Sequence, residues 1–129
     1  MENRKLVVLT LIFGALAVTL GAFGAHGLKP YMDEAGISNF QTANRYHFYH
    51  VFLALFIVLF PGNKNKASNL AIVFALIGIV LFSGSLYVMA LNKLIHYPGW
   101  FPILTPLGGL CFIIAWTLLI FHFVRSVKI

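Results

Sequence analysis

Four long apolar blocks, separated by short polar segments, make up most of the 129-residue chain. Each block is close to the roughly 20 residues that a helix needs to cross the hydrocarbon core of a bilayer. The remaining segments are too short for a soluble domain. The pattern therefore predicts an all-α, polytopic membrane protein with one membrane domain over residues 1–129. The predicted spans are about residues 6–26, 40–60, 69–91 and 103–124.

Turn-forming residues mark the predicted boundary between the first two spans. Pro30 and Gly36 act as helix breakers in this interpretation. Ser38 or Asn39 would then cap the second helix, because their side chains can accept hydrogen bonds from the first free backbone N–H groups. Pro61 and the glycine after it predict the end of that helix.

Composition supports a membrane protein and excludes a soluble enzyme domain. Hydrophobic residues make up 60% of the chain and charged residues 9%, whereas soluble domains carry roughly 25% charged residues. The mean hydropathy is +0.92. The net charge of +6 does not indicate nucleic-acid binding, because the basic residues are scattered at the ends of apolar blocks. The single cysteine, Cys111, excludes an intrachain disulfide and a cysteine-based metal cluster.

Basic residues favour one end of the predicted bundle. Six lie near the N-terminus, in the 61–68 turn or near the C-terminus: Arg4, Lys5, Lys64, Lys66, Arg125 and Lys128. The opposite side holds Lys29 and Lys93, with Arg45 as a third. Because cytoplasmic loops are rich in Lys and Arg, both termini are predicted to be cytoplasmic. Short connections favour antiparallel neighbours, hence an antiparallel four-transmembrane-helix bundle.

Small residues recur at steps of three or four along the first span. This spacing places them on one helix face and allows a neighbouring helix to approach closely. The predicted helix-packing residues are Gly14, Ala17, Gly21, Gly24 and Ala25.

The second span begins with a polar stretch, residues 40–50, which runs directly into ten apolar residues. Ionisable side chains inside a span are costly and mark candidate functional sites. At about 100° per residue, His47 and His50 lie roughly 60° apart on one face, which we predict faces the bundle. Arg45 occupies another sector. It would snorkel to the interface, pair with a loop carboxylate or hold an anionic lipid headgroup.

The predicted topology gathers polar side chains from three helices in the outer half of the membrane. A structural polar cluster is predicted from Arg45, Tyr46, Ser83, Ser85 and Asn92. The histidines His26, His47 and His50 would join it as buried hydrogen-bonding groups. Alternatively, the three imidazoles would bind a metal ion, a haem or a quinone. No carboxylate lies in the spans as a further ligand, and His96 and His122 are predicted to be ordinary interface residues.

Several motifs in order along the chain resemble the small membrane family catalogued as domain of unknown function, DUF 423. They are Gly-Ala-Phe-Gly-Ala-His-Gly-Leu at 21–28, Phe-Gln-Thr-Ala at 40–43, Tyr46-His-x-x-His50, Ser-Gly-Ser-Leu-Tyr at 83–87, Pro-Leu-Gly-Gly at 106–109, and Trp116. The resemblance covers nearly the whole chain. It implies a four-span, multi-pass protein of the bacterial cytoplasmic (inner) membrane, with relatives in eukaryotes. It supplies no catalytic or ligand residues.

These observations favour a non-enzymatic membrane protein that contacts lipid and packs with itself or with a larger membrane complex. No cofactor is required by this interpretation. One alternative is a redox or cofactor protein that uses the outer histidines. A second is a small oligomeric transporter or channel. A hydrolase is disfavoured, because no acidic residue in the spans would orient a histidine and no nucleophile elbow is present.

Overall fold

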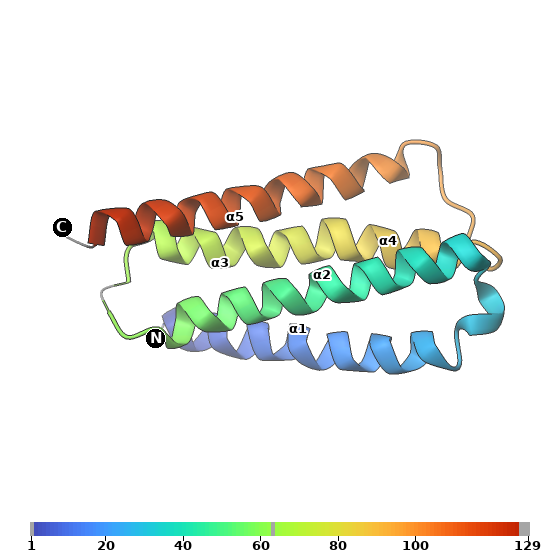
Figure 1. The fold of residues 1–129 in the computed structure, drawn as a ribbon, viewed down its shortest axis with the longest axis horizontal. Coiled ribbons are helices and arrows are strands. Elements are labelled where there is room, and N and C mark those ends of the chain that lie inside the picture. The colour runs from blue at the N-terminus through green and yellow to red at the C-terminus, as the bar shows by residue number, and fades with distance from the viewer. Residues whose placement is uncertain (1, 63, 127–129) are drawn as a thin grey trace.

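The computed structural model describes residues 2–62 and 64–126, which form a bundle of antiparallel helical rods (Figure 1). The α-helices are α1 (Glu2–Ala25), α2 (Glu34–Leu59), α3 (Lys66–Gly78), α4 (Gly84–Ala90) and α5 (Leu104–Ser126). Three short helices are η1 (Lys29–Tyr31), η2 (Ile79–Ser83) and η3 (Phe101–Ile103). Segment η2 is a π-helical turn that joins α3 to α4 in one rod, and the described residues contain no strand.

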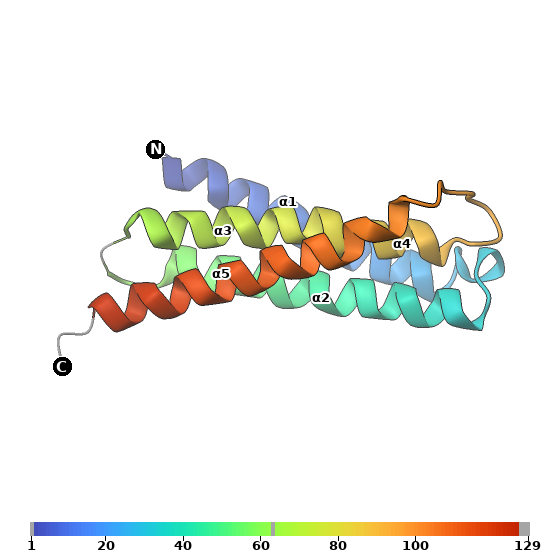
Figure 2. The ribbon, with the colours of Figure 1, turned by 90° about the horizontal axis from the view of Figure 1, so that it is seen from above.

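The two ends of the bundle differ in what they contain (Figures 1 and 2). The start of α1, the end of α2, the start of α3 and the end of α5 lie together at what we call the terminal end. The 26–33 and 91–103 connections lie at the opposite end, called the loop end. The most basic segments of the sequence therefore gather at the terminal end.

Three helices of the described chain are long and apolar enough to cross a membrane. They are Arg4–Ala25, Lys66–Ala90 and Phe101–Ser126. Helix α2 has 26 residues, but the polar stretch in its first half makes it less apolar than these three.

Helix α2 begins earlier than the sequence predicted. The side chain of Asp33 caps it by accepting a hydrogen bond from the Gly36 N–H at 2.7 Å. The predicted cap by Ser38 or Asn39 is therefore wrong. Gly36 is also not a helix breaker, because it lies in the first turn, where a Cβ would collide with the Ala90 carbonyl oxygen. Glycine at this position lets α2 and α4 approach closely.

The rods pack mainly as neighbouring pairs: α1 with α2, α2 with α3 and α4, and α3 with α5. One apolar cluster joins α2, α3 and α5 and includes Ile72 and Phe112. A second cluster lies near the loop end, where Phe40, Leu86 and Met32 pack together. Helix α2 contributes to both clusters and is the central element of the bundle.

Most of the small residues predicted on α1 face α2. A Cβ added at Gly14 would contact Val51, one at Gly21 would contact Asn44, and one at Gly24 would collide with the Phe40 ring. Ala17 is fully buried, whereas Ala25 is exposed at the end of the helix. The seam therefore joins two helices of the same chain.

Gly108 and Gly109 provide a matched test of the close approach between α5 and η2. A Cβ at Gly108 would collide with the backbone nitrogen of Phe82, whereas a Cβ at Gly109 would meet a Phe82 ring carbon at an ordinary 3.8 Å. We expect Gly108→Ala to lower the free energy of unfolding by about 1–3 kcal/mol through overpacking. Unfolding in detergent, followed by circular dichroism, measures the change. Equal loss of stability in Gly109→Ala would contradict the proposed contact.

Candidate functional site

A buried polar network crosses the bundle between α1, α2 and α4, with the Tyr87 hydroxyl at its centre. The Asn44 side-chain amide donates to the Ala17 carbonyl oxygen at 2.9 Å and to the Tyr87 hydroxyl oxygen at 3.0 Å. His47 Nδ1 lies 3.0 Å from the same hydroxyl. Because the Tyr87 oxygen accepts from Asn44, its own proton is placed to donate to His47 Nδ1. The network therefore assigns the Nε2–H tautomer to His47.

The imidazole of His47 is directed toward α1. It is 3% exposed, and its ring meets the Phe13 ring edge-on with centroids 6.3 Å apart. Its buried Nε2 has no hydrogen-bond partner among the described residues. An unpaired buried donor costs about 1–3 kcal/mol. Of the two ring nitrogens of His47, only Nδ1 therefore has a hydrogen-bond partner in the described part of the chain.

His50 lies one turn further along α2 and faces α5 instead. Its Nδ1 is 2.7 Å from the Tyr46 carbonyl oxygen, so this nitrogen carries the proton. Its Nε2 accepts a hydrogen bond from the Trp116 indole N–H at 3.2 Å, and its ring stacks on Phe112 with centroids 3.5 Å apart. Both nitrogens of this neutral imidazole are therefore occupied. The Tyr46 ring packs outside this contact against Phe82.

Two serines beside the π-helical turn make further contacts between helices. The Ser83 hydroxyl, at the end of η2, donates to the Ala43 carbonyl oxygen of α2 at 2.7 Å. The Ser85 hydroxyl lies 2.6 Å from the Thr105 hydroxyl of α5. Neither serine has a histidine partner in these contacts, so their geometry is that of helix-to-helix hydrogen bonds.

The other predicted site residues lie outside this network. His26 is exposed in the turn after α1. Arg45 is exposed on α2 and donates to the Thr42 hydroxyl at 3.3 Å. The Asn92 side-chain oxygen accepts from the Asp33 N–H at 3.3 Å, which ties the two loops together. Hydrogen bonds from Asn92 and from the backbone of the first turn of α2 hold the pKa of the Asp33 carboxyl below its usual range.

The three histidines considered as cofactor ligands are directed to three different places. His26 is exposed, His47 faces α1 and α4, and His50 faces α5. The described residues contain no group of three His, Cys, Asp or Glu side chains that could hold a metal ion. A haem iron or metal ion at His50 Nε2 would have to displace the Trp116 indole. The donor set therefore does not fit a three-histidine centre.

Sequence reasoning missed neutral polar residues that complete the network: Asn44, Tyr87 and Thr105. Asn44 precedes His47 by three positions, a helical spacing that could have revealed a shared face. Trp116 was noted only through the family resemblance. His122 was predicted to be an ordinary interface residue. It lies at the terminal end, and its side chain is buried within the bundle, with 8% exposed.

Removing the Tyr87 hydroxyl tests whether the network stabilises the fold. We expect Tyr87→Phe to lower the free energy of unfolding by about 1 kcal/mol, because Asn44 and His47 both lose a partner. Tyr49→Phe is the control, since Tyr49 is 54% exposed. Denaturation in detergent measures both variants, and equal stability of Tyr87→Phe and wild type would contradict a stabilising network.

Comparison with known proteins identifies relatives over nearly the whole chain. The UPF0382 membrane protein YwdK of Bacillus subtilis is 38% identical over 122 residues, covering 91% of this chain and 94% of YwdK. A UPF0382 membrane protein of Haemophilus influenzae is 36% identical over 126 residues, with 98% of each chain covered. The UPF0382 inner membrane protein YgdD of Escherichia coli is 33% identical over 126 residues, covering 97% of this chain and 93% of YgdD.

No solved structure matches this chain significantly. The family described as "Protein of unknown function (DUF423)" matches residues 20–109, which include all of α2, α3, the π-helical turn and α4. This match and the full-length relatives agree with the long apolar helices of the bundle. The chain belongs to the DUF423 family of small membrane proteins, whose biochemical function is unknown.

Proposed function

We propose that this chain is a non-enzymatic, multi-pass component of the bacterial cytoplasmic membrane, with four spans and both termini in the cytoplasm. Support comes from the terminal end, whose segments carry five of the eight Lys and Arg residues in the described part of the chain. Positive residues mark the cytoplasmic side of membrane proteins. The 26-residue length of α2 is sufficient for a fourth span despite its polar first half.

The observation that carries the structural role is the pairing of buried polar groups across helices. Tyr87 and Asn44 join α4, α2 and α1, while Ser83 joins η2 to α2. The contact between His50 and Trp116 joins α2 to α5. These side chains hydrogen-bond to one another or to the backbone of a neighbouring helix. This pairing favours a role in helix packing over a role as nucleophile, base or cofactor ligand. Neither the contacts nor the names of the relatives point to redox chemistry or transport.

The outward face of α2 supports contact with a second copy or with a larger membrane complex. Gln41, Arg45 and Tyr49 are exposed along this helix. Polar side chains facing hydrocarbon are unfavourable, so a partner that offers hydrogen bonds would stabilise them. Lipid headgroups would serve Arg45 where its side chain reaches the membrane surface.

Cysteine cross-linking tests this face. In a Cys111→Ser background, we expect oxidised membranes carrying Tyr49→Cys to give a disulfide-linked dimer or a linked complex, because partner residues would lie within disulfide range. Gel electrophoresis without reductant measures the products. Ile113→Cys is the control, since Ile113 is exposed on a different helix, α5. Monomer alone from both variants, with a monomeric mass in mild detergent, would contradict association through α2.

Cysteine labelling tests the orientation in the same background. We expect a membrane-impermeant maleimide to label Lys93→Cys in intact spheroplasts and Lys66→Cys only after lysis, because these positions lie at opposite ends of the bundle. The reverse pattern would invert the proposed topology. Labelling of both before lysis would contradict a membrane-crossing arrangement of the connecting helices.

A further inference from the structure

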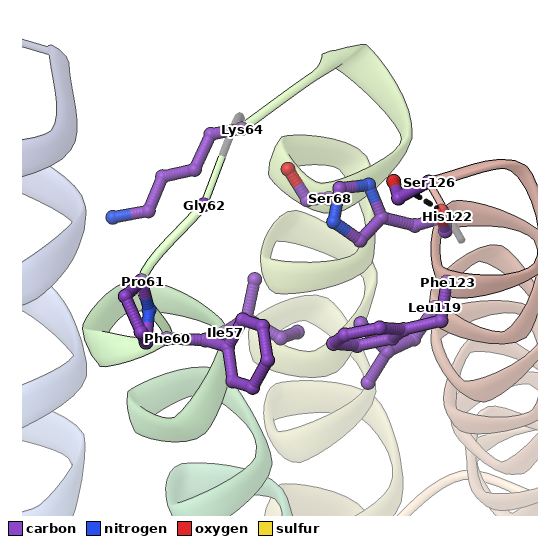
Figure 3. Close-up of a pocket in the computed structure, with 10 residues that line it drawn as sticks. All are labelled: Ile57, Phe60, Pro61, Gly62, Lys64, Ser68, Leu119, His122, Phe123 and Ser126. Carbon is purple, nitrogen blue, oxygen red and sulfur yellow. Dashed lines mark hydrogen bonds between the residues drawn. The ribbon is translucent and has the colours of Figure 1, made fainter. Parts of the chain in front are cut away.

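A cavity of about 490 Å³ opens at the terminal end, away from the polar network. It lies between the end of α2, the start of α3 and the end of α5 (Figure 3). Its apolar part is lined by Ile57, Phe60, Leu119 and Phe123, with the rings of Phe60 and Phe123 packed edge to face at 4.9 Å between centroids. Other residues of the lining carry polar side chains. A cavity with an apolar part and a polar part suits an amphiphilic ligand.

His122 supplies an unused polar atom to this cavity. Its Nδ1 is 3.0 Å from the Asn65 side-chain oxygen, which also accepts the Ser68 N–H at 3.0 Å. That oxygen is an acceptor, so His122 Nδ1 carries a proton and acts as the donor. Nε2 makes no hydrogen bond to any residue in the described part of the chain, and Figure 3 shows the ring directed into the cavity. The residue as a whole is 92% buried and lines the cavity, so its free nitrogen is accessible from the cavity.

The charges around the cavity favour an anion. Lys64 lines it, and its ammonium group donates to the Val58 carbonyl oxygen at the end of α2. Lys66 starts α3, whose free N–H groups carry the positive end of the helix dipole. The carboxylates of Asp33 and Glu34 lie at the loop end, far from the cavity. The third acidic residue of the sequence, Glu2, is the first residue of α1.

We propose that this cavity binds the phosphate group of an anionic amphiphile, with His122 as the donor and Lys64 as a second donor once its ammonium group turns from the Val58 carbonyl oxygen toward the cavity. Protonated His122 can donate from Nε2 to a phosphate oxygen while Nδ1 keeps its bond to Asn65. Such charge-assisted hydrogen bonds are stronger than neutral ones. The apolar chain of the ligand lies against Phe60 and Phe123, and the position of the cavity at the end of the helices places the phosphate near a membrane surface.

Two substitutions of His122 separate binding from folding. Asparagine places an amide nitrogen near the position of Nδ1, so His122→Asn retains the contact with Asn65 but has no atom at Nε2. Glutamine places its amide nitrogen near Nε2 and gives up the Asn65 contact. The probe is phosphatidylglycerol in nanodiscs with excess phosphatidylcholine, and native mass spectrometry counts the lipid retained by the full chain.

We expect wild type to retain phosphatidylglycerol selectively, His122→Asn to retain about tenfold less, and His122→Gln to stay near wild type, because one charge-assisted bond accounts for about tenfold in affinity. Lys64→Met lowers retention without altering the contact with Asn65. His96→Asn, at an exposed position in the loop-end connection, is the control and leaves retention unchanged. Circular dichroism checks that each variant is folded.

The proposal would be overturned if folded His122→Asn retained as much phosphatidylglycerol as wild type, or if only His122→Gln lost the lipid. Either result would mean that the role of His122 is its hydrogen bond to Asn65. Equal retention of the two lipids by wild type would also overturn it. Inorganic phosphate added to the nanodiscs distinguishes the sources of the phosphate group. Displacement of the lipid assigns the site to a soluble phosphate, whereas retention assigns it to a lipid headgroup.

Discussion

A membrane interior offers no water, so each buried polar group of this bundle needs a partner within the protein. Helix α2 is where this constraint is strongest, because its first half carries Asn44, His47 and His50 in sequence with an apolar second half. Together these side chains reach three neighbouring helices: Asn44 contacts α1 and α4, His47 contacts α4, and His50 contacts α5. Satisfying them therefore fixes the rotation of α2 and the positions of the helices around it.

The π-helical turn follows from the same constraint. The wider turn of η2 ends at Ser83, so it changes the direction in which Ser83 and Ser85 project relative to the residues of α3. In this arrangement Ser83 reaches the Ala43 carbonyl of α2 and Ser85 reaches Thr105 of α5. The same turn brings the Phe82 backbone against Gly108, where only glycine fits without displacement. A local irregularity thus lets one rod hydrogen-bond to two neighbours.

The all-helical architecture could be predicted from the sequence, because the length of each apolar block indicates a helix and the turn-forming residues indicate where it ends. The start of α2 could not, because Gly36 is ambiguous: in isolation it reads as a breaker, but here it permits contact with Ala90. The histidines were recognisable as buried candidates from their spacing. Their directions were not, since a separation of about 60° on a helix wheel does not say which neighbouring helix each ring meets. The hydrogen-bonding roles of Tyr87 and Trp116 were not predicted, because aromatic residues in an apolar block ordinarily indicate packing alone.

Pairing also distinguishes the two polar regions of the molecule. In the network near the loop end, the polar atoms of Asn44, Tyr87 and His50 meet one another or a neighbouring helix, which leaves little for a ligand to bind. At the terminal end, His122 uses one nitrogen to hold the Asn65 cap and keeps the other facing a cavity. An imidazole nitrogen with no protein partner adds nothing to helix packing and is free to bind a ligand. The His47 ring packs edge-on against the Phe13 ring, whereas the His122 ring is directed into a cavity of molecular size. For this reason the terminal end, and not the histidine-rich first half of α2, is the part of the bundle best suited to a ligand.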